Sequence, residues 1–150
     1  MKRLKGLILF IIIVLAGIQF IPVKRNIDTN VLLTDFILTY KPPEKVSNIL
    51  KTSCYNCHSN NTDYPWYSYV QPVGMYLQGH INEGKENLNL SEFGNYSDRR
   101  QKSKLISMIN QINENEMPLP AYTLIHRDAK LSEEDKKEVI KFLEILKDSL

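Results

Sequence analysis

Two cysteines and a histidine stand close together in the segment "TSCYNCHSN". Cys54 and Cys57 are the only cysteines of the 150-residue chain, and His58 directly follows the second one. Thiols and an imidazole at this spacing can form a disulfide, exchange electrons as a dithiol pair, bind zinc or hold a haem. The choice among these four chemistries decides what kind of protein this is.

Three of the four chemistries fit the rest of the sequence poorly. A disulfide between Cys54 and Cys57 is possible outside the cytoplasm, but it closes a very small ring and leaves His58 without a role. A thioredoxin-like redox pair needs a preceding strand within an α/β pattern, and neither is visible. A structural zinc ion needs four ligands. The remaining histidines, His80 and His126, are far away in the sequence and are not paired with each other.

The fourth chemistry, covalent attachment of haem c, accounts for all three residues because C-x-x-C-H is its signature. Two thiols three residues apart on one helical turn can each add to a vinyl group of haem. The next residue then projects from the same turn toward the iron. We therefore expect Cys54 and Cys57 to bind the cofactor and His58 to be the proximal iron ligand. Tyr55 and Asn56 act as a spacer and need no role of their own.

The second axial position of the iron decides the function, because an open position permits ligand binding and a second protein ligand favours electron transfer. Met117 is the preferred candidate, since the prolines of "EMPLP" restrict the backbone and could present the thioether at a fixed point. A thioether on the iron raises its reduction potential. The alternative for Met117 is a loop residue anchored on the core. The other candidates are Met75, Met108, His80 and His126.

The N-terminus has the composition of a membrane segment. Gly6–Val23 is 18 residues without a charge and follows the basic residues Lys2, Arg3 and Lys5. As a helix it would be about 27 Å long, close to the roughly 30 Å of a bilayer core. Apolar residues continue beyond Ala16, which favours an uncleaved signal anchor over a cleaved signal peptide. The basic N-terminus then predicts an inner-membrane anchor with the remaining chain on the periplasmic side.

The chain divides into three parts on this basis. Residues 1–23 are expected to be a signal anchor or transmembrane helix, residues 24–42 a tether, and residues 43–150 the haem-binding domain. The apolar segment Val31–Tyr40 within the tether is expected to pack on the domain. No convincing period-two alternation and no internal repeat is present, which predicts an all-α domain.

Four helices are predicted in the domain from the spacing of apolar residues. Their inward residues are expected to be Val46, Ile49 and Leu50; Val73, Tyr76, Leu77 and Ile81; Leu105, Ile106, Ile109 and Ile112; and Val139, Phe142, Leu143 and Leu146. Gly84 is expected to end the second helix. Ser132 and Asp135 form a variant of the capping box at the start of the fourth. Pro118 and Pro120 are expected to exclude regular structure between the third and the fourth.

The segments "CYNCHSNNTDYPWYSYVQPVGMYLQGHINEGKENLNLSEF", the late "MP" and "HRDAKLS" resemble the bacterial haem-binding domain family of membrane-anchored, cytochrome c-like proteins. The resemblance covers roughly Val46 to Leu146, plus the anchor. It implies a small cytochrome c-like helical domain wrapped around a covalent haem c. In this family the cysteines bind the haem and the histidine ligates it, which corresponds here to Cys54, Cys57 and His58. Met117, in the late "MP", corresponds to the sixth ligand.

The leading hypothesis is a membrane-tethered, monohaem electron-transfer protein with iron held by His58 and Met117. Its expected partners are membrane or periplasmic redox proteins and the cytochrome c maturation machinery. The alternative is a haem-based peroxidase or ligand sensor with a labile or open sixth position, where His80 or His126 acts as a distal acid and base. A structural metal or disulfide module is the third possibility. An electron carrier is favoured over an enzyme, so no catalytic residue is assigned.

The charge balance argues against a nucleic-acid partner. Without the three basic residues at the N-terminus, 16 basic residues remain against 17 acidic residues. A domain with this balance has no general basic surface, so we do not expect it to bind nucleic acid.

Overall fold

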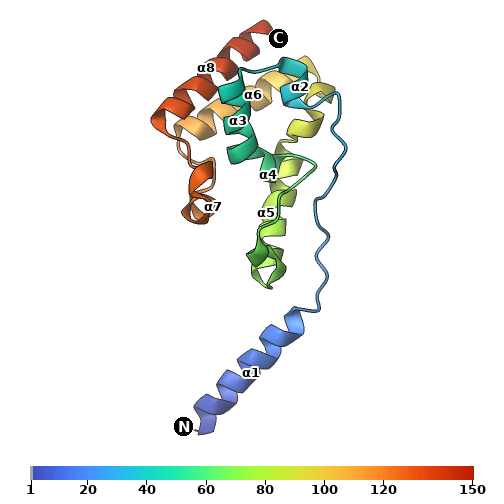
Figure 1. Cartoon of the computed structure of the whole chain (residues 1–150), viewed down its shortest axis with the longest axis vertical. Coiled ribbons are helices and arrows are strands. Elements are labelled where there is room, and N and C mark those ends of the chain that lie inside the picture. The colour runs from blue at the N-terminus through green and yellow to red at the C-terminus, as the bar shows by residue number, and fades with distance from the viewer. Residues whose placement is uncertain (1) are drawn as a thin grey trace.

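The structure is a computed structural model that describes residues 2–150, and all the regular structure within these residues is helical. The prediction of an all-α protein is therefore confirmed. One helix stands apart, and an extended segment joins it to a compact group of helices (Figure 1). The elements are α1 (Lys2–Ile18), α2 (Phe36–Tyr40), α3 (Glu44–Leu50), η1 (Lys51–Tyr55), α4 (Asn56–His58), η2 (Trp66–Tyr69), α5 (Val73–Asn87), η3 (Leu90–Asn95), α6 (Asp98–Asn113), α7 (Pro120–Ile125), η4 (Arg127–Ala129) and α8 (Glu133–Ser149).

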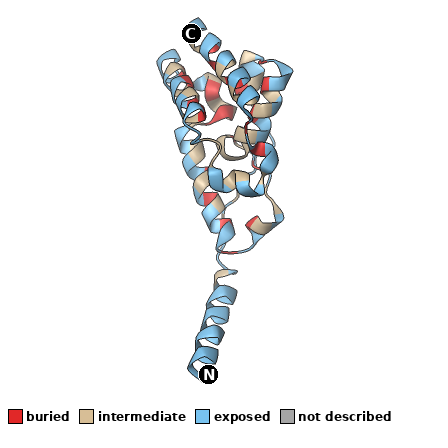
Figure 2. Ribbon diagram, turned by 90° about the vertical axis from the view of Figure 1, so that its left-hand side faces the viewer, coloured by how far each residue is buried: buried red, intermediate tan, exposed pale blue. Residues whose placement is uncertain are grey.

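Helix α1 projects away from the domain and buries none of its side chains (Figure 2). It is 17 residues long and ends at Ile18, five residues before the predicted end at Val23. Among residues 2–150, no helix combines the length and the apolar content that crossing a membrane requires. The structure therefore does not support the transmembrane helix that was predicted within residues 1–23.

The segment that follows α1 joins the core through α2. Asp35 caps this helix, since its carboxylate accepts hydrogen bonds from the backbone N–H groups of Ile37 and Leu38. Phe36 is fully buried, and its ring meets that of Phe93 edge to face with centroids 4.9 Å apart. The prediction that Val31–Tyr40 packs on the domain is thus met in part, since Phe36, Ile37 and Tyr40 join the core. Val31, Leu33 and Leu38 are exposed. The packed part of the chain begins before residue 43.

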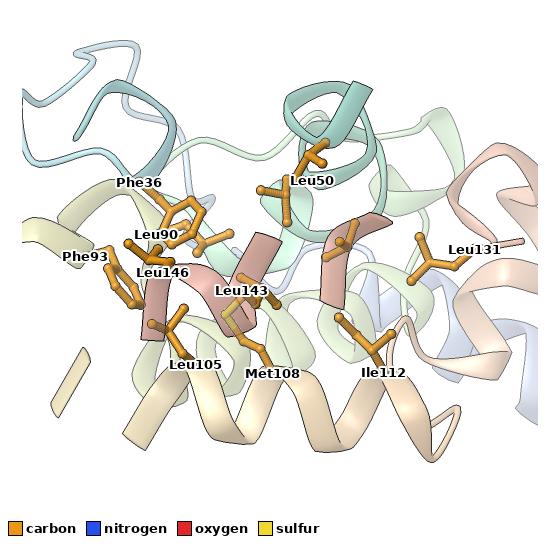
Figure 3. Packing of buried hydrophobic residues seen from close by; sticks show 12 residues of the cluster. Phe36, Leu50, Leu90, Phe93, Leu105, Met108, Ile112, Leu131, Leu143 and Leu146 are labelled. Carbon is orange, nitrogen blue, oxygen red and sulfur yellow. The ribbon is translucent and has the colours of Figure 1, made fainter. Parts of the chain in front are cut away.

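The hydrophobic core lies between α3, α6, α8 and the turn η3 (Figure 3). The inner stripe predicted for α8 is largely confirmed, because Val139, Leu143 and Leu146 are buried. In α6, Leu105 and Ile112 are buried as predicted. Ile106 is exposed, however, and Met108 takes the inward position between them. The buried positions 105, 108 and 112 follow the helical period. The prediction was wrong for Ile106 because this residue is apolar but lies beside the buried stripe.

Helix α5 presents a different face to the domain than its apolar residues predict. Its buried residues are Gly74, Gln78 and Ile81, at spacing i, i+4 and i+7, whereas Val73 and Tyr76 are exposed. A side chain at position 74 would collide with the backbone of η2, so only glycine allows this close approach. The Gln78 amide oxygen accepts the hydroxyl hydrogen bond of Tyr64, which satisfies a buried polar group.

Two predictions about helix ends have opposite outcomes. Pro120 does not exclude regular structure, because it begins α7 at a position where its missing N–H is not needed. The capping box at the start of α8 is confirmed. The Ser132 side chain accepts from the Asp135 N–H, and the Asp135 carboxylate accepts from the Ser132 N–H.

Candidate functional site

The C-x-x-C-H motif lies at the end of a continuous helical segment. Helix α3 runs into the π-helical turn η1, which contains Cys54, and then into α4, which contains Cys57 and His58. Val46 and Leu50 of α3 are buried in the core and anchor the segment at its base. A single π-helical turn within an α-helix is rare and frequently marks a functional site. The spacing of the apolar residues Val46, Ile49 and Leu50 predicts the helix but not this turn.

Two backbone carbonyls hold the imidazole of His58. Its Nδ1 lies 2.9 Å from the oxygen of Gly84 and 3.2 Å from that of Leu88. Because a carbonyl oxygen only accepts, Nδ1 carries the proton and Nε2 keeps a free lone pair. Burial lowers the pKa of His58, and this effect outweighs the hydrogen bonds to the two carbonyls, which raise the pKa. A neutral, oriented imidazole with a free Nε2 is the form in which histidine ligates a metal.

Helix α5 comes unusually close to the motif at Gly84. A Cβ at this position would lie 2.9 Å from the carbonyl oxygen of Cys57 and 3.4 Å from Cε1 of His58. The prediction that Gly84 ends the helix is wrong, because α5 continues to Asn87. Gly84 is the residue that lets the helix backbone reach the histidine. A glycine inside a run of good helix formers is the sequence signal that could have indicated this role.

The two thiols are free and half-buried. Burial, together with the neighbouring Cys57, raises the pKa of Cys54 to about 12. Burial also raises the pKa of Cys57. Both cysteines therefore remain thiols near neutral pH, which is unfavourable for a dithiol redox pair, because the reactive form is the thiolate. Within residues 2–150, no group of three or more His, Cys, Asp or Glu side chains is gathered as a metal site.

A cavity of about 370 Å³ lies beside the motif. All four of the predicted site residues, Cys54, Cys57, His58 and Met117, line it. The rest of its wall comes mainly from α5, α6 and the segment that follows α6. The volume is within the range of about 300–1,000 Å³ that is typical of cofactor and ligand pockets. These four residues, which are up to 63 positions apart in the sequence, thus meet at one hollow in the domain.

The backbone of Met117 is fixed to the end of α6. The carbonyl oxygen of Gln111 accepts hydrogen bonds from the N–H groups of Glu116 (2.9 Å) and Met117 (3.2 Å). Asn115 adopts a left-handed conformation with φ of 60°, which turns the chain back toward the helix. The half-buried thioether is thereby held at the cavity by a tight turn as well as by the adjacent prolines.

The other candidates for an iron ligand have different surroundings. Met108 lines the cavity but is also part of the hydrophobic core, and His80 lines the cavity from α5. Met75 is exposed on α5 and does not line the cavity. His126 lies outside it, where its Nε2 is hydrogen-bonded to the hydroxyl of Tyr67. Of the two histidines considered for a distal role, only His80 is therefore at the cavity.

Sequence reasoning missed several polar residues of the cavity wall, three of which lie on α6. Lys104, Ser107 and Gln111 line it from α6, and their spacing places them on one face of that helix. They supply a cation and hydrogen-bonding groups at a cavity whose lining is mostly apolar. In the sequence these three residues form a polar stripe beside the apolar stripe of the same helix. Sequence alone does not distinguish such a stripe from an ordinary solvent-exposed face.

A comparison with protein families gives a match over most of the chain. Residues 13–145 match the haem-binding domain family. No curated protein and no solved structure matches the chain. The matched range contains the two cysteines, the histidine and the whole cavity wall. Since it covers most of the chain, the chain belongs to the haem-binding domain family and is a haem-binding protein.

Proposed function

We propose that the chain is a membrane-attached, c-type cytochrome-like protein that carries one covalent haem and transfers single electrons. The observation that carries the proposal is the shared cavity. Two thiols, an imidazole with a free Nε2 and a thioether line one mostly apolar hollow. These are the groups that attach haem c and ligate its iron in His/Met cytochromes.

Each residue has a distinct part in this proposal. Cys54 and Cys57 form the two covalent bonds to the haem, and His58 ligates the iron through Nε2. Met117 is the second axial ligand, since the turn that follows α6 holds its backbone at the cavity. Lys104 offers an ammonium group to a haem carboxylate. The haem supplies the exchange of one electron between the ferrous and ferric states, and a thioether ligand favours the ferrous state.

The same proposal includes the place of the protein in the cell. Helix α1 exposes an almost wholly apolar surface, and we propose that it attaches the chain to the inner membrane. The basic residues Lys2, Arg3 and Lys5 favour the cytoplasmic side, which leaves the haem domain on the periplasmic side. The maturation machinery for haem c is then one partner. Membrane or periplasmic redox proteins are the others, met through the small interfaces typical of transient electron transfer.

Production in a bacterial host that matures cytochromes c tests the attachment. The expected result is a protein heavier than the polypeptide by the mass of one haem, with a pyridine haemochrome spectrum of haem c. A Cys54→Ala, Cys57→Ala variant should lack this added mass. A wild-type protein with the bare polypeptide mass and two free thiols would contradict the proposal.

Optical spectroscopy of the ferric protein tests the sixth ligand. The methionine-to-iron charge-transfer band is expected in the wild type and should be lost in Met117→Ala. Met75→Ala is the matched control and should retain the band, because Met75 is exposed and outside the cavity. Loss of the band in Met108→Leu but not in Met117→Ala would move the ligand to α6. Rapid binding of carbon monoxide or cyanide by the wild type would instead favour a peroxidase or a ligand sensor.

A further inference from the structure

We propose that the end of the haem domain nearest α1 docks on the lipid bilayer through an aromatic face. This inference rests on the proposed membrane attachment and extends it, because it says which surface of the domain meets the membrane. We call the surface the aromatic face and define it by five exposed residues, which lie in η2, directly after it and in the first turn of α5. They are Trp66, Tyr69, Val70, Val73 and Tyr76.

These side chains are far more exposed than is usual for their types. Trp66 is 81% exposed, Tyr69 63% and Tyr76 64%. The elements that carry them, η2 and α5, contact each other, so the five residues form a neighbourhood and are not scattered. Single exposed apolar residues are normal on a protein surface, but a group of this size indicates an interaction site.

The stretch of chain that carries this face contains no charged residue that would favour its exposure to water. The 19 residues from Tyr64 to Asn82 include no Asp, Glu, Lys or Arg. In the rest of the domain, exposed helical surfaces carry many charged residues, as in α6 and α8. The lack of acidic residues matters most, because they would be repelled by anionic lipid headgroups.

Two hydrogen bonds hold the end of α1 next to the segment that carries the aromatic face. Gln19, directly after this helix, donates a hydrogen bond from its amide to the carbonyl oxygen of Gln71 (3.0 Å) and accepts one from the Gln71 N–H (3.0 Å). Gln71 is a buried residue that follows Val70 of the face, between η2 and α5 in the chain. The end of α5 that carries the face is also the end nearest α1 (Figure 1). A membrane that holds α1 therefore lies close to these side chains.

Basic residues border the face and fit an anionic lipid surface. The guanidinium of Arg25 lies over the rings of Tyr69 (3.8 Å) and Tyr64 (4.5 Å), and Lys24 precedes it as an exposed residue. Tryptophan and tyrosine prefer the boundary between hydrocarbon and headgroups, and lysine and arginine bind anionic headgroups. This combination fits a bilayer interface better than it fits the surface of another soluble protein.

Trp66 is the only tryptophan of the chain, so one fluorine label reports on the face. The experiment uses the full chain with its haem in the ferrous state, labelled with 5-fluorotryptophan and placed in nanodiscs of phosphatidylcholine and phosphatidylglycerol. Fluorine NMR then compares a gadolinium chelate attached to lipid headgroups with a soluble gadolinium chelate. The lipid chelate should broaden the Trp66 signal severalfold more than the soluble chelate. Tyr69→Ser with Tyr76→Ser should reduce this preference.

A control moves the reporter to a remote surface. Trp66→Phe with Ile145→Trp retains an aromatic residue in the face and places the label on α8, where Ile145 is 62% exposed. This signal should be broadened by the soluble chelate and not by the lipid chelate. The same pattern at Trp66, in a chain retained on the nanodisc, would overturn docking and leave attachment through α1 intact. Protection of Trp66 from both chelates would mean that this chain or a second copy of it covers the face, which would also overturn the inference. A chain that is not retained at all would refute both proposals.

Discussion

The substitution Gly84→Ala tests how the domain holds its histidine. The added methyl group would lie 2.9 Å from the carbonyl oxygen of Cys57 and 3.4 Å from the ring of His58. The first distance is shorter than any ordinary carbon–oxygen contact, and its partner is a backbone atom that cannot rotate away. Either α5 or the motif must therefore shift.

The magnitude follows from two opposing contributions. Alanine in a helix interior is favoured over glycine by about 0.8–1.0 kcal/mol. Overpacking at a tight contact costs about 1–3 kcal/mol. Gly79→Ala is the matched control, because Gly79 is in the same helix and has no atom within 4 Å of an added Cβ. Both variants gain the same helix preference of alanine over glycine, so it cancels in the difference between their unfolding free energies. The remaining difference is the cost of the close contact at position 84, about 1–3 kcal/mol.

Thermal unfolding of the haem-loaded protein, followed by circular dichroism, measures this difference. For a domain of this size, 1 kcal/mol corresponds to roughly 4 °C in Tm. Gly79→Ala should therefore raise Tm by about 4 °C, and Gly84→Ala should fall below Gly79→Ala by about 4–12 °C. The visible spectrum should change only in Gly84→Ala, since only that methyl group reaches His58. Equal Tm values and unchanged spectra for both variants would refute the close approach of α5 to the motif.

Three further predictions concern stability. Phe36→Ala should lower the free energy of unfolding by about 3–5 kcal/mol in guanidinium titrations because the ring is fully buried, and a loss below 1 kcal/mol would mean that α2 does not belong to the core. Hydrogen bonds from Ser132 lower the pKa of Asp135 below its ordinary value of 3.8. The wild type should therefore be more stable than Asp135→Ala above pH 3.8. This advantage should disappear as the pH falls through the lowered pKa. A difference that does not change with pH would refute this role of the carboxylate. The Cys54→Ala, Cys57→Ala protein should be largely unfolded, because a cofactor bound only by the native state stabilises that state. A cooperative melt near the wild-type temperature would contradict this prediction.

The spacing of residues within one element was a reliable guide. The inner stripe of α8 and its capping box follow from residues at most a few positions apart, and the structure has both. The two cysteines were also expected on a helical turn with the histidine, and Cys54, Cys57 and His58 do lie in helical elements. These features depend on local geometry, which repeats every 3.6 residues and therefore leaves a trace in the sequence.

The orientation of α5 could not be predicted in the same way. Its apolar residues Val73 and Tyr76 indicated one face, but the close contact of Gly74 with η2 and the bond of Gln78 to Tyr64 selected another. A helix with few apolar residues has no strong preference of its own, so tertiary contacts decide which side is buried. This rotation also exposes Val73 and Tyr76, the two residues of the aromatic face that lie on α5.

The order of the residues was enough to infer that the chain is helical, where its last helix begins, and which two thiols and imidazole lie together. How the imidazole is held depends on the packing of distant segments, because Gly84 and Leu88 lie 26 and 30 positions after His58. This packing likewise decides that Met117 shares a cavity with the motif. The physical reason is that hydrogen bonds and close contacts between distant segments depend on how helices pack, and packing leaves no periodic signal in the order of the residues.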